Sequence, residues 1–191
     1  MDKQKYFVHE SSYIDDEVLI GDGTQIWHFC HLQKGAVIGK QCVLGQNVNI
    51  SNSVKIGDGC KIQNNVSVYE GVELEDYVFC GPSMVFTNDL TPRAKFPKGR
   101  TGYKKTLLRT GASIGANATI VCGNIIGKWA MVSAGAVVTK DVKDYALVVG
   151  VPAEQIGWVC KCGTVLEELK CPFCNRKYQL TDKETLEEIG F

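Results

Sequence analysis

The stretch IDDEVL IGDGTQ IWHFCH LQKGAV IGKQCV LGQNVN, residues 14–49, opens every group of six with an aliphatic residue. Apolar residues keep this six-residue step without a slip as far as Phe86. The step is lost after Thr87, returns at Leu108 and continues to Val138. The fifth residue of each group is mostly small or β-branched, as in Val18, Ala36 and Val48. Glycine often follows the opening residue, as at Gly21, Gly39, Gly45 and Gly57.

A repeat of six matches neither the 3.6-residue period of a helix nor the two-residue period of an ordinary strand. It matches a short strand followed by a corner, so that three groups close a triangular coil of 18 residues. Successive coils then stack at the usual strand spacing of ~4.8 Å. Because one coil cannot bury its own apolar face, stacking supplies the stability. The sequence therefore predicts an all-β protein, a parallel β-helix with four coils over residues 14–85 and two more over 108–143.

Composition excludes several classes of function. The chain has 191 residues with 21 basic and 21 acidic side chains, so no global charge favours nucleic acid or an anionic membrane. No apolar run approaches the ~20 residues of a membrane span, and the N-terminus lacks the apolar core of a signal peptide. We therefore expect a cytoplasmic protein with no nucleic-acid or membrane partner, whose nine cysteines are thiols or metal ligands.

Most of these cysteines have a place in the repeat. The inward positions of the coils include four of them, which we expect to be small core residues: Cys30, Cys42, Cys60 and Cys80. Cys122 falls on a corner, where its role stays open.

Residues 18 apart should lie one above another on successive coils. His28, Gln46 and Asn64 then share one column, and we expect them to contact substrate or to be structural. Glu70 and Asn88 share another column, about one strand spacing apart.

The repeat is interrupted by residues 88–107, NDLTPRAKFPKGRTGYKKTL, which carry six basic side chains against the single acid Asp89. A loop of this length inside a compact fold is usually functional. Arg93, Tyr103 and Lys104 are candidate substrate contacts, because such a patch suits a diphosphate or a carboxylate. A solvated surface loop is the alternative.

Several blocks of the chain are similar to one family. They are WHFCH (27–31), LGQNV (44–48), IQNNVSVYEGV (62–72), GPSMVFTN (81–88), PRA (92–94), GASIGANATIVCG (111–123) and AGAVVTKDV (134–142). They resemble the hexapeptide-repeat N-acetyltransferases of nucleotide-linked amino sugars, most closely those acting on UDP-2-acetamido-3-amino-2,3-dideoxy-glucuronate. The resemblance implies a left-handed β-helix, a homotrimer with active sites between subunits, and acetyl-CoA as cosubstrate in surface polysaccharide biosynthesis.

The last coils resemble the coenzyme channel of this family. Glycine and alanine at positions 111, 112, 115, 116, 118 and 134–136 are expected to leave backbone amides exposed to a pantetheine arm. The coenzyme-binding residues implied in this way are Gly111, Asn117, Ala134, Gly135 and Lys140, with Lys140 meeting a phosphate.

The histidines do not suit a general base near the thioester. His9, His28 and His31 are the only ones, and none lies in the later coils. We therefore expect Asn88 to hold the sugar amine through a hydrogen bond. Glu70 is expected to orient the amine or Asn88, or to take a proton. A backbone amide would stabilise the oxyanion, and the departing thiolate itself is another candidate acceptor of the proton.

The six-residue groups end after Pro152, which predicts a β-helix domain over residues 1–157 and a cysteine-rich tail over 158–191. The tail carries four cysteines that suit a closed tetrahedral structural Zn²⁺ site, although the first pair has only one residue between its members: Cys160, Cys162, Cys171 and Cys174. The alternative is a tail without metal, reduced or disulfide-bonded. The segment 181–184, TDKE, has the pattern of a capping box and predicts a short C-terminal helix.

Other functions fit less well. A carbonic anhydrase on this fold needs three histidine ligands on neighbouring coils and subunits, which His28 and His31 cannot supply. A hydroxyl nucleophile would require the missing histidine base, which disfavours an O-acetyltransferase. A non-enzymatic β-helical scaffold would not bind acetyl-CoA, and a thermal shift separates it from an enzyme. A transferase for another dTDP- or UDP-linked amino sugar remains the nearest alternative.

Overall fold

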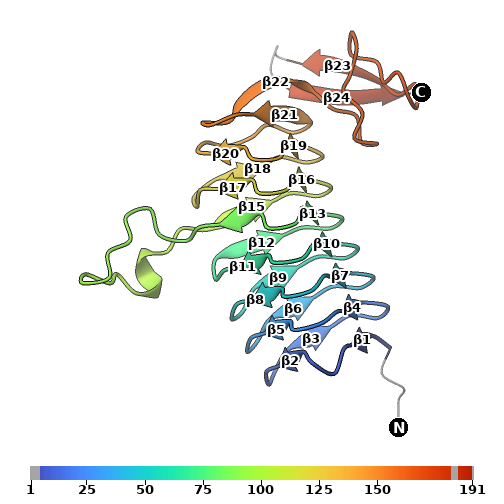
Figure 1. The fold of residues 1–191 in the computed structure, drawn as a ribbon. Helices are drawn as coiled ribbons and strands as arrows, with labels where there is room; N and C mark the ends of the chain where they lie inside the picture. Colours follow the sequence, from blue (N-terminus) through green and yellow to red (C-terminus); the bar gives the residue numbers. More distant parts are fainter. Residues whose placement is uncertain (1–4, 182–184, 191) are drawn as a thin grey trace.

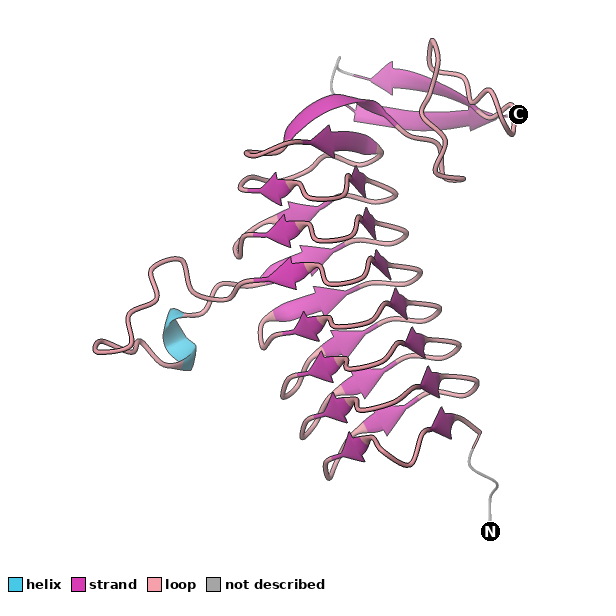
Figure 2. Cartoon of the chain, viewed as in Figure 1, coloured by secondary structure: helices cyan, strands magenta, loops and turns pink. Residues whose placement is uncertain are grey.

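The computed structural model describes residues 5–181 and 185–190. The chain forms a triangular prism of stacked coils, with a protruding loop (residues 88–107) and a small end unit (described residues 159–181 and 185–190) (Figures 1 and 2). Most of its strands are two residues long, with the first residue directed outward and the second directed into the prism. Among the described residues the only helix is one 3₁₀ turn, η1 (Arg100–Gly102), in the protruding loop. The predicted parallel β-helix is thereby confirmed.

The first face runs the full height of the prism. Its parallel strands are β1 (Phe7–Val8), β4 (Gln25–Ile26), β7 (Val43–Leu44), β10 (Lys61–Ile62), β13 (Phe79–Cys80), β16 (Ser113–Ile114), β19 (Met131–Val132) and β21 (Ala146–Val149). The antiparallel strand β22 (Glu154–Trp158) closes it at the top.

The second face is split in two. Its lower part holds β2 (Tyr13–Ile14), β5 (His31–Leu32), β8 (Asn49–Ile50) and β11 (Ser67–Val68). Its upper part holds β14 (Val85–Phe86), β17 (Thr119–Ile120) and β20 (Val137–Val138). The third face is continuous through β3 (Leu19–Ile20), β6 (Val37–Ile38), β9 (Lys55–Ile56), β12 (Val72–Leu74), β15 (Thr106–Leu108) and β18 (Ile125–Ile126).

The register follows the predicted columns. Ile26 pairs with Leu44, and Leu44 pairs with Ile62, so each level advances 18 residues. Cys80 pairs with Ile114, which shows that the level with the loop has 16 extra residues and that the frame is kept across it. The coils also begin earlier than predicted: Val8 lies one step before Ile14 and pairs with Ile26.

Glycine recurs at two different positions of the corners. The fourth residue of nearly every group has a positive φ, as at Gly111 (72°) and Asn65 (62°), and glycine adopts it without strain. The glycine that follows the opening residue has another cause, because it lies against the coil above. A Cβ at Gly39 would come within 2.5 Å of the backbone of Gly57. The positive φ of the corner thus explains glycine only at the first of these positions.

The interior of the prism is one continuous apolar core. The four cysteines expected on inward positions are all buried there: Cys30, Cys42, Cys60 and Cys80. Burial raises the pKa of the Cys80 thiol to about 12, so it stays protonated. Cys122 is buried as well, and its backbone N–H donates to the Thr87 hydroxyl at 2.9 Å.

The tail differs from the prediction. β23 (Lys177–Thr181) and β24 (Thr185–Gly190) form an antiparallel hairpin, so the predicted C-terminal helix is wrong. Six residues are too few to nucleate a helix by themselves, whereas the hairpin buries Tyr178 and Leu186 in a small separate core. Residues 182–184 of the capping-box pattern lie outside the described residues.

Candidate functional site

A hollow lies at the corner between the first and second faces, on the lower coils. The predicted column is confirmed here, since His28, Gln46 and Asn64 line this hollow together with Trp27. The aromatic rings at its edge are layered: the His28 ring stacks on His9 at 3.5 Å between centroids and lies nearly parallel to Trp27. The arrangement offers flat apolar faces beside amide groups.

Asn64 also has a structural role in this hollow. Its Oδ1 accepts a hydrogen bond from the backbone N–H of Gln46 on the coil below, at 2.9 Å. A Cβ at Gly45 would collide with this same oxygen, so the glycine makes room for it. The Asn64 amide nitrogen is therefore the part of the side chain that is left for a ligand.

Glu70 and Asn88 lie at the next corner, between the second and third faces. Strands β11 and β14, which precede them, are neighbours without a hydrogen-bonded ladder, and this is where the second face is split. Within the described residues no hydrogen bond joins the two side chains. Instead Oε2 of Glu70 accepts from Nε of Arg100 at 3.1 Å, and the carbonyl of Asn88 accepts from the backbone N–H of Lys104 at 3.0 Å.

The protruding loop is anchored by its own charges. Nζ of Lys98 lies 3.0 Å from Oδ1 of Asp89, and the same oxygen accepts the backbone N–H of Thr91 at 2.8 Å. These two interactions, the backbone hydrogen bond first, hold the pKa of the Asp89 carboxyl below its usual value. Two of the six basic side chains are thus occupied within the chain, Lys98 here and Arg100 with Glu70.

The predicted substrate contacts of the loop are spread along it. Arg93 is exposed in the outer part, whereas Tyr103 and Lys104 lie at its base, next to Asn88. The loop leaves the prism at the second corner, and the hollow with His28 lies at the first. One strand of the second face separates these corners, so a single chain does not bring the two groups of residues together.

The upper coils carry an apolar groove at the first face. Ala134 lines it beside Ser133, Met131, Gly115 and Phe79. Asn117 and Gly135 lie at the adjoining corner and are exposed. Ala134 lies in the column of Pro82 and Asn64, and the backbone N–H of Asn117 donates to the carbonyl of Pro82 at 3.1 Å.

Other residues of the predicted coenzyme channel lie elsewhere. Gly111 is buried at the corner between the third and first faces, where the ring of Trp129 covers it. Ala112, Ala118 and Ala136 point into the core with no exposed surface. Their small size is required by packing, and the expectation that they expose backbone amides is wrong.

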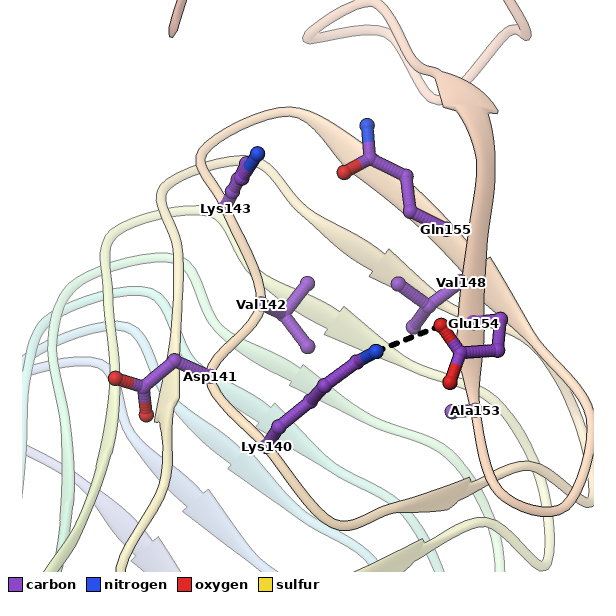
Figure 3. Close-up of a pocket in the computed structure, with 8 residues that line it drawn as sticks. All are labelled: Lys140, Asp141, Val142, Lys143, Val148, Ala153, Glu154 and Gln155. Carbon is purple, nitrogen blue, oxygen red and sulfur yellow. Dashed lines mark hydrogen bonds and ion pairs between the residues drawn. The ribbon is translucent and has the colours of Figure 1, made fainter. Parts of the chain in front are cut away.

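Lys140 borders a hollow of about 370 Å³ at the top of the prism. Its ammonium group and the carboxylate of Glu154 face each other across this hollow at 2.7 Å, with Val142 and Val148 behind them (Figure 3). Lys140 belongs to the column of Asn88 and Cys122, one corner away from the apolar groove. It therefore does not line the groove with Ala134.

Comparison with known proteins gives the family. Residues 17–52 match the model of the bacterial transferase hexapeptide (six repeats), and residues 35–70 and 111–140 match that of the hexapeptide repeat of succinyl-transferase. The dTDP-3-amino-3,6-dideoxy-alpha-D-galactopyranose 3-N-acetyltransferase of Aneurinibacillus thermoaerophilus is 42% identical over 181 residues, which cover 92% of both chains. This chain belongs to the hexapeptide-repeat acyltransferases.

Other relatives agree with this assignment. The bifunctional protein GlmU of Thermotoga maritima is 31% identical over 154 residues, which are 78% of this chain and 30% of that protein. A hexapeptide-repeat acetyltransferase of Vibrio cholerae, solved with acetyl coenzyme A, is 26% identical with a TM-score of 0.58. The match covers 66% of this chain and 72% of that one. Within the described residues no helix is long and apolar enough to cross a membrane.

Several residues that border these candidate sites were not found from the sequence. Trp27, next to His28, was within reach of the column rule, because Gly45 and Gln63 of its own column line the same hollow. Arg100 and Glu154, the partners of Glu70 and Lys140, carry no such signal, since a loop and an antiparallel return strand lie outside the repeat.

Proposed function

We propose that this acyltransferase moves the acetyl group of acetyl-CoA to the amino group of a nucleotide-linked sugar, at carbon 3 of the hexose. The observation that carries the proposal is the 42% identity, over nearly the whole of both chains, to an enzyme named for this reaction on a dTDP-linked sugar. The Vibrio cholerae structure supports acetyl-CoA as the donor.

The substrate named by that relative and the one suggested by the sequence blocks are both 3-amino sugars. They differ in the nucleotide, dTDP or UDP, and in carbon 6, which is a methyl group in the first and a carboxylate in the second. They differ also at carbon 2, hydroxyl against acetamido, and in the configuration of carbon 4. Arg93, Lys104 and Lys105 form no ion pair among the described residues, so they are available to a diphosphate and to a uronate carboxylate. We infer the uronate as substrate, in the synthesis of a surface polysaccharide.

The geometry supports separate binding places for the nucleotide and for the coenzyme. The layered rings of Trp27 and His28 suit a nucleotide base, with Gln46 and the amide nitrogen of Asn64 as polar contacts. The apolar groove at Ala134 suits the pantetheine arm, with Asn117 and Gly135 at its rim. We leave Gly111 out of this groove because Trp129 covers it.

In the proposed reaction the neutral sugar amine attacks the thioester carbonyl, so that a C–N bond forms and the C–S bond breaks. Asn88 Oδ1 accepts a hydrogen bond from the amine and aims its lone pair, while a backbone N–H stabilises the oxyanion. The amine proton passes to the departing thiolate, which leaves as the thiol. Glu70 acts by positioning, because its carboxylate holds Arg100 of the loop.

Two copies of the chain are needed for this site. Asn88 and Ala134 lie at different corners of one prism, whereas corners of neighbouring prisms meet in a symmetric ring. The outward residues of the second face, between these corners, include no Lys, Arg, Asp or Glu: Tyr13, His31, Asn49, Ser67, Val85, Thr119 and Val137. Such a face suits contact between subunits, and we propose a homotrimer.

The test is an assay of released coenzyme A thiol with a panel of nucleotide amino sugars. It contains UDP-3-amino-2-acetamido-2,3-dideoxy-glucuronate, dTDP-3-amino-3,6-dideoxy-galactose and a 4-amino sugar of each nucleotide. We expect the highest kcat/KM with the uronate. Higher kcat/KM with the dTDP sugar would replace the uronate by the substrate of the relative, and thiol release with the 4-amino sugars alone would overturn the 3-amino assignment.

A further inference from the structure

Four cysteine sulfurs converge in the end unit, apart from every residue used in the proposed reaction. Sγ atoms of Cys160, Cys162, Cys171 and Cys174 all lie within 4.8 Å of one another. A regular tetrahedron of sulfurs at the Zn–S distance of about 2.3 Å has edges of about 3.8 Å. The Cys160–Cys174 and Cys162–Cys171 sulfurs are 3.4 and 3.5 Å apart, near that edge and well beyond a disulfide bond. We propose that these four thiolates bind one structural Zn²⁺ ion.

Two tight turns bring the sulfurs together. In the first, Gly163 has a φ of 90° and its N–H donates to the carbonyl of Cys160 at 2.8 Å. This reversal lets both Cys160 and Cys162 reach the site although only one residue separates them. In the second, the N–H of Asn175 donates to the carbonyl of Cys171 at 3.0 Å, and Asn175 has a φ of 63°.

Donors surround the sulfurs as in sites built for thiolates. The Cys174 backbone N–H donates to Sγ of Cys171 at 3.4 Å, the Arg176 guanidinium to Sγ of Cys174 at 3.1 Å, and the Tyr178 hydroxyl to Sγ of Cys160 at 3.2 Å. Four thiolates around Zn²⁺ carry a net charge of −2, which such donors stabilise and orient. Buried apolar cysteines would not require them.

The end unit has little else to hold it together. Among the described residues, its core cluster has four buried members, of which Cys160 and Cys171 are two, with Tyr178 and Leu186 as the others. Units below about 40 residues rarely fold without a metal, disulfides or a partner surface. The Zn²⁺ ion therefore supplies the end unit with stability that its small core does not provide.

The metal unit is fastened to the last coils. The N–H of Val159 donates to the carbonyl of Tyr145 at 2.8 Å, and the rings of Tyr145 and Tyr178 meet edge to face at 5.5 Å. Nζ of Lys161, the residue between the first two ligands, lies 5.9 Å from the centre of the Trp129 ring. The site thus forms an end cap that covers the top of the first face.

The experiment starts from the full-length chain purified without chelator. Elemental analysis is expected to find about one zinc ion per chain. Stepwise addition of a mercurial should release it in proportion to the thiols modified, as read with a zinc-binding dye. Replacement by Co²⁺ should produce the visible ligand-field bands of a tetrahedral tetrathiolate site. None of these readouts depends on catalysis, so they stand whether or not the proposed reaction does.

Matched variants locate the site. Cys160→Ser and Cys171→Ser are expected to lose the zinc, whereas Cys122→Ala, which removes a buried cysteine of the prism, should retain it. If the serine variants do not fold, the cobalt spectrum of the wild-type chain decides alone. Absence of zinc together with absence of the cobalt bands would overturn the proposal, as would a mass spectrum showing disulfides between these cysteines.

Discussion

Asn88 is the residue on which the proposed chemistry depends most. We expect Asn88→Ala to lower kcat/KM about 10²–10³-fold, the usual loss for removal of one group that positions or stabilises the reacting atoms. The Kd of this variant for coenzyme A should not change, because the amide is proposed to contact the sugar amine and not the coenzyme in the groove at Ala134. Steady-state kinetics and calorimetric titration measure the two quantities.

Asn52 provides the control for this prediction. It lies two coils below Asn88 in the same column, away from the loop. Asn52→Ala should therefore leave both quantities near their wild-type values. Turnover by Asn88→Ala close to that of Asn52→Ala would remove Asn88 from the mechanism.

Thr24 shows how a polar residue is accommodated in the core. It is fully buried, and its hydroxyl donates to the carbonyl of Gly39 at 2.8 Å and accepts the N–H of Cys42 at 3.0 Å. Thr24→Val has nearly the same shape but leaves both groups without a partner. We expect it to lower the free energy of unfolding by about 1–3 kcal/mol, as measured by urea denaturation.

The matched change Thr24→Ser keeps the hydroxyl and removes one methyl group. It should cost less than Thr24→Val, and the opposite order would show that packing, rather than hydrogen bonding, fixes this position. The sequence indicated that the side chain faces inward, but it gave no sign of its two partners. The partners are backbone groups of the coil above, and the repeat does not specify how closely they lie to the Thr24 hydroxyl.

At the scale of elements, the six-residue step predicted more than strand positions. It predicted which residues pair, and the register Phe86 to Ile120 confirms that the frame survives the loop. It did not predict the split between β11 and β14, because both strands keep the apolar pattern. It did not predict the path of the loop either, because ion pairs such as that of Arg100 with Glu70 depend on conformation rather than on spacing.

One contact joins the elements on either side of this loop. Oε2 of Glu75 accepts both the backbone N–H and the hydroxyl of Thr110 at 2.8 Å, across 35 residues of sequence. The Thr110 hydroxyl is the main cause that holds the pKa of the Glu75 carboxyl below its ordinary value of 4.5. A depressed folded-state pKa stabilises the fold above that ordinary value, and the contribution is lost as pH falls through the folded-state pKa.

We therefore expect Glu75→Gln to be less stable than the wild type at neutral pH. The difference should shrink once the pH falls below the ordinary value of 4.5, as the wild-type carboxyl takes up its proton. Urea denaturation over a pH series measures it. Glu73→Gln, which changes an outward carboxylate on the neighbouring strand position, is the control and should show no such trend. A difference that stays constant with pH would remove the carboxylate from this account.

At the scale of the whole molecule, the separation of Asn88 from Ala134 predicts shared active sites. Asn88→Ala and Ala134→Trp should each inactivate a trimer, the first by losing the positioning amide and the second by filling the groove. When the two chains are co-expressed and mix at random, about a quarter of the interfaces pair an intact amide with an intact groove. Thiol release should recover to that fraction of the wild-type rate.

Analytical ultracentrifugation should show three chains per particle. A mixture as inactive as its parents would place both residues in one chain's site, and a monomer would rule out the shared arrangement altogether.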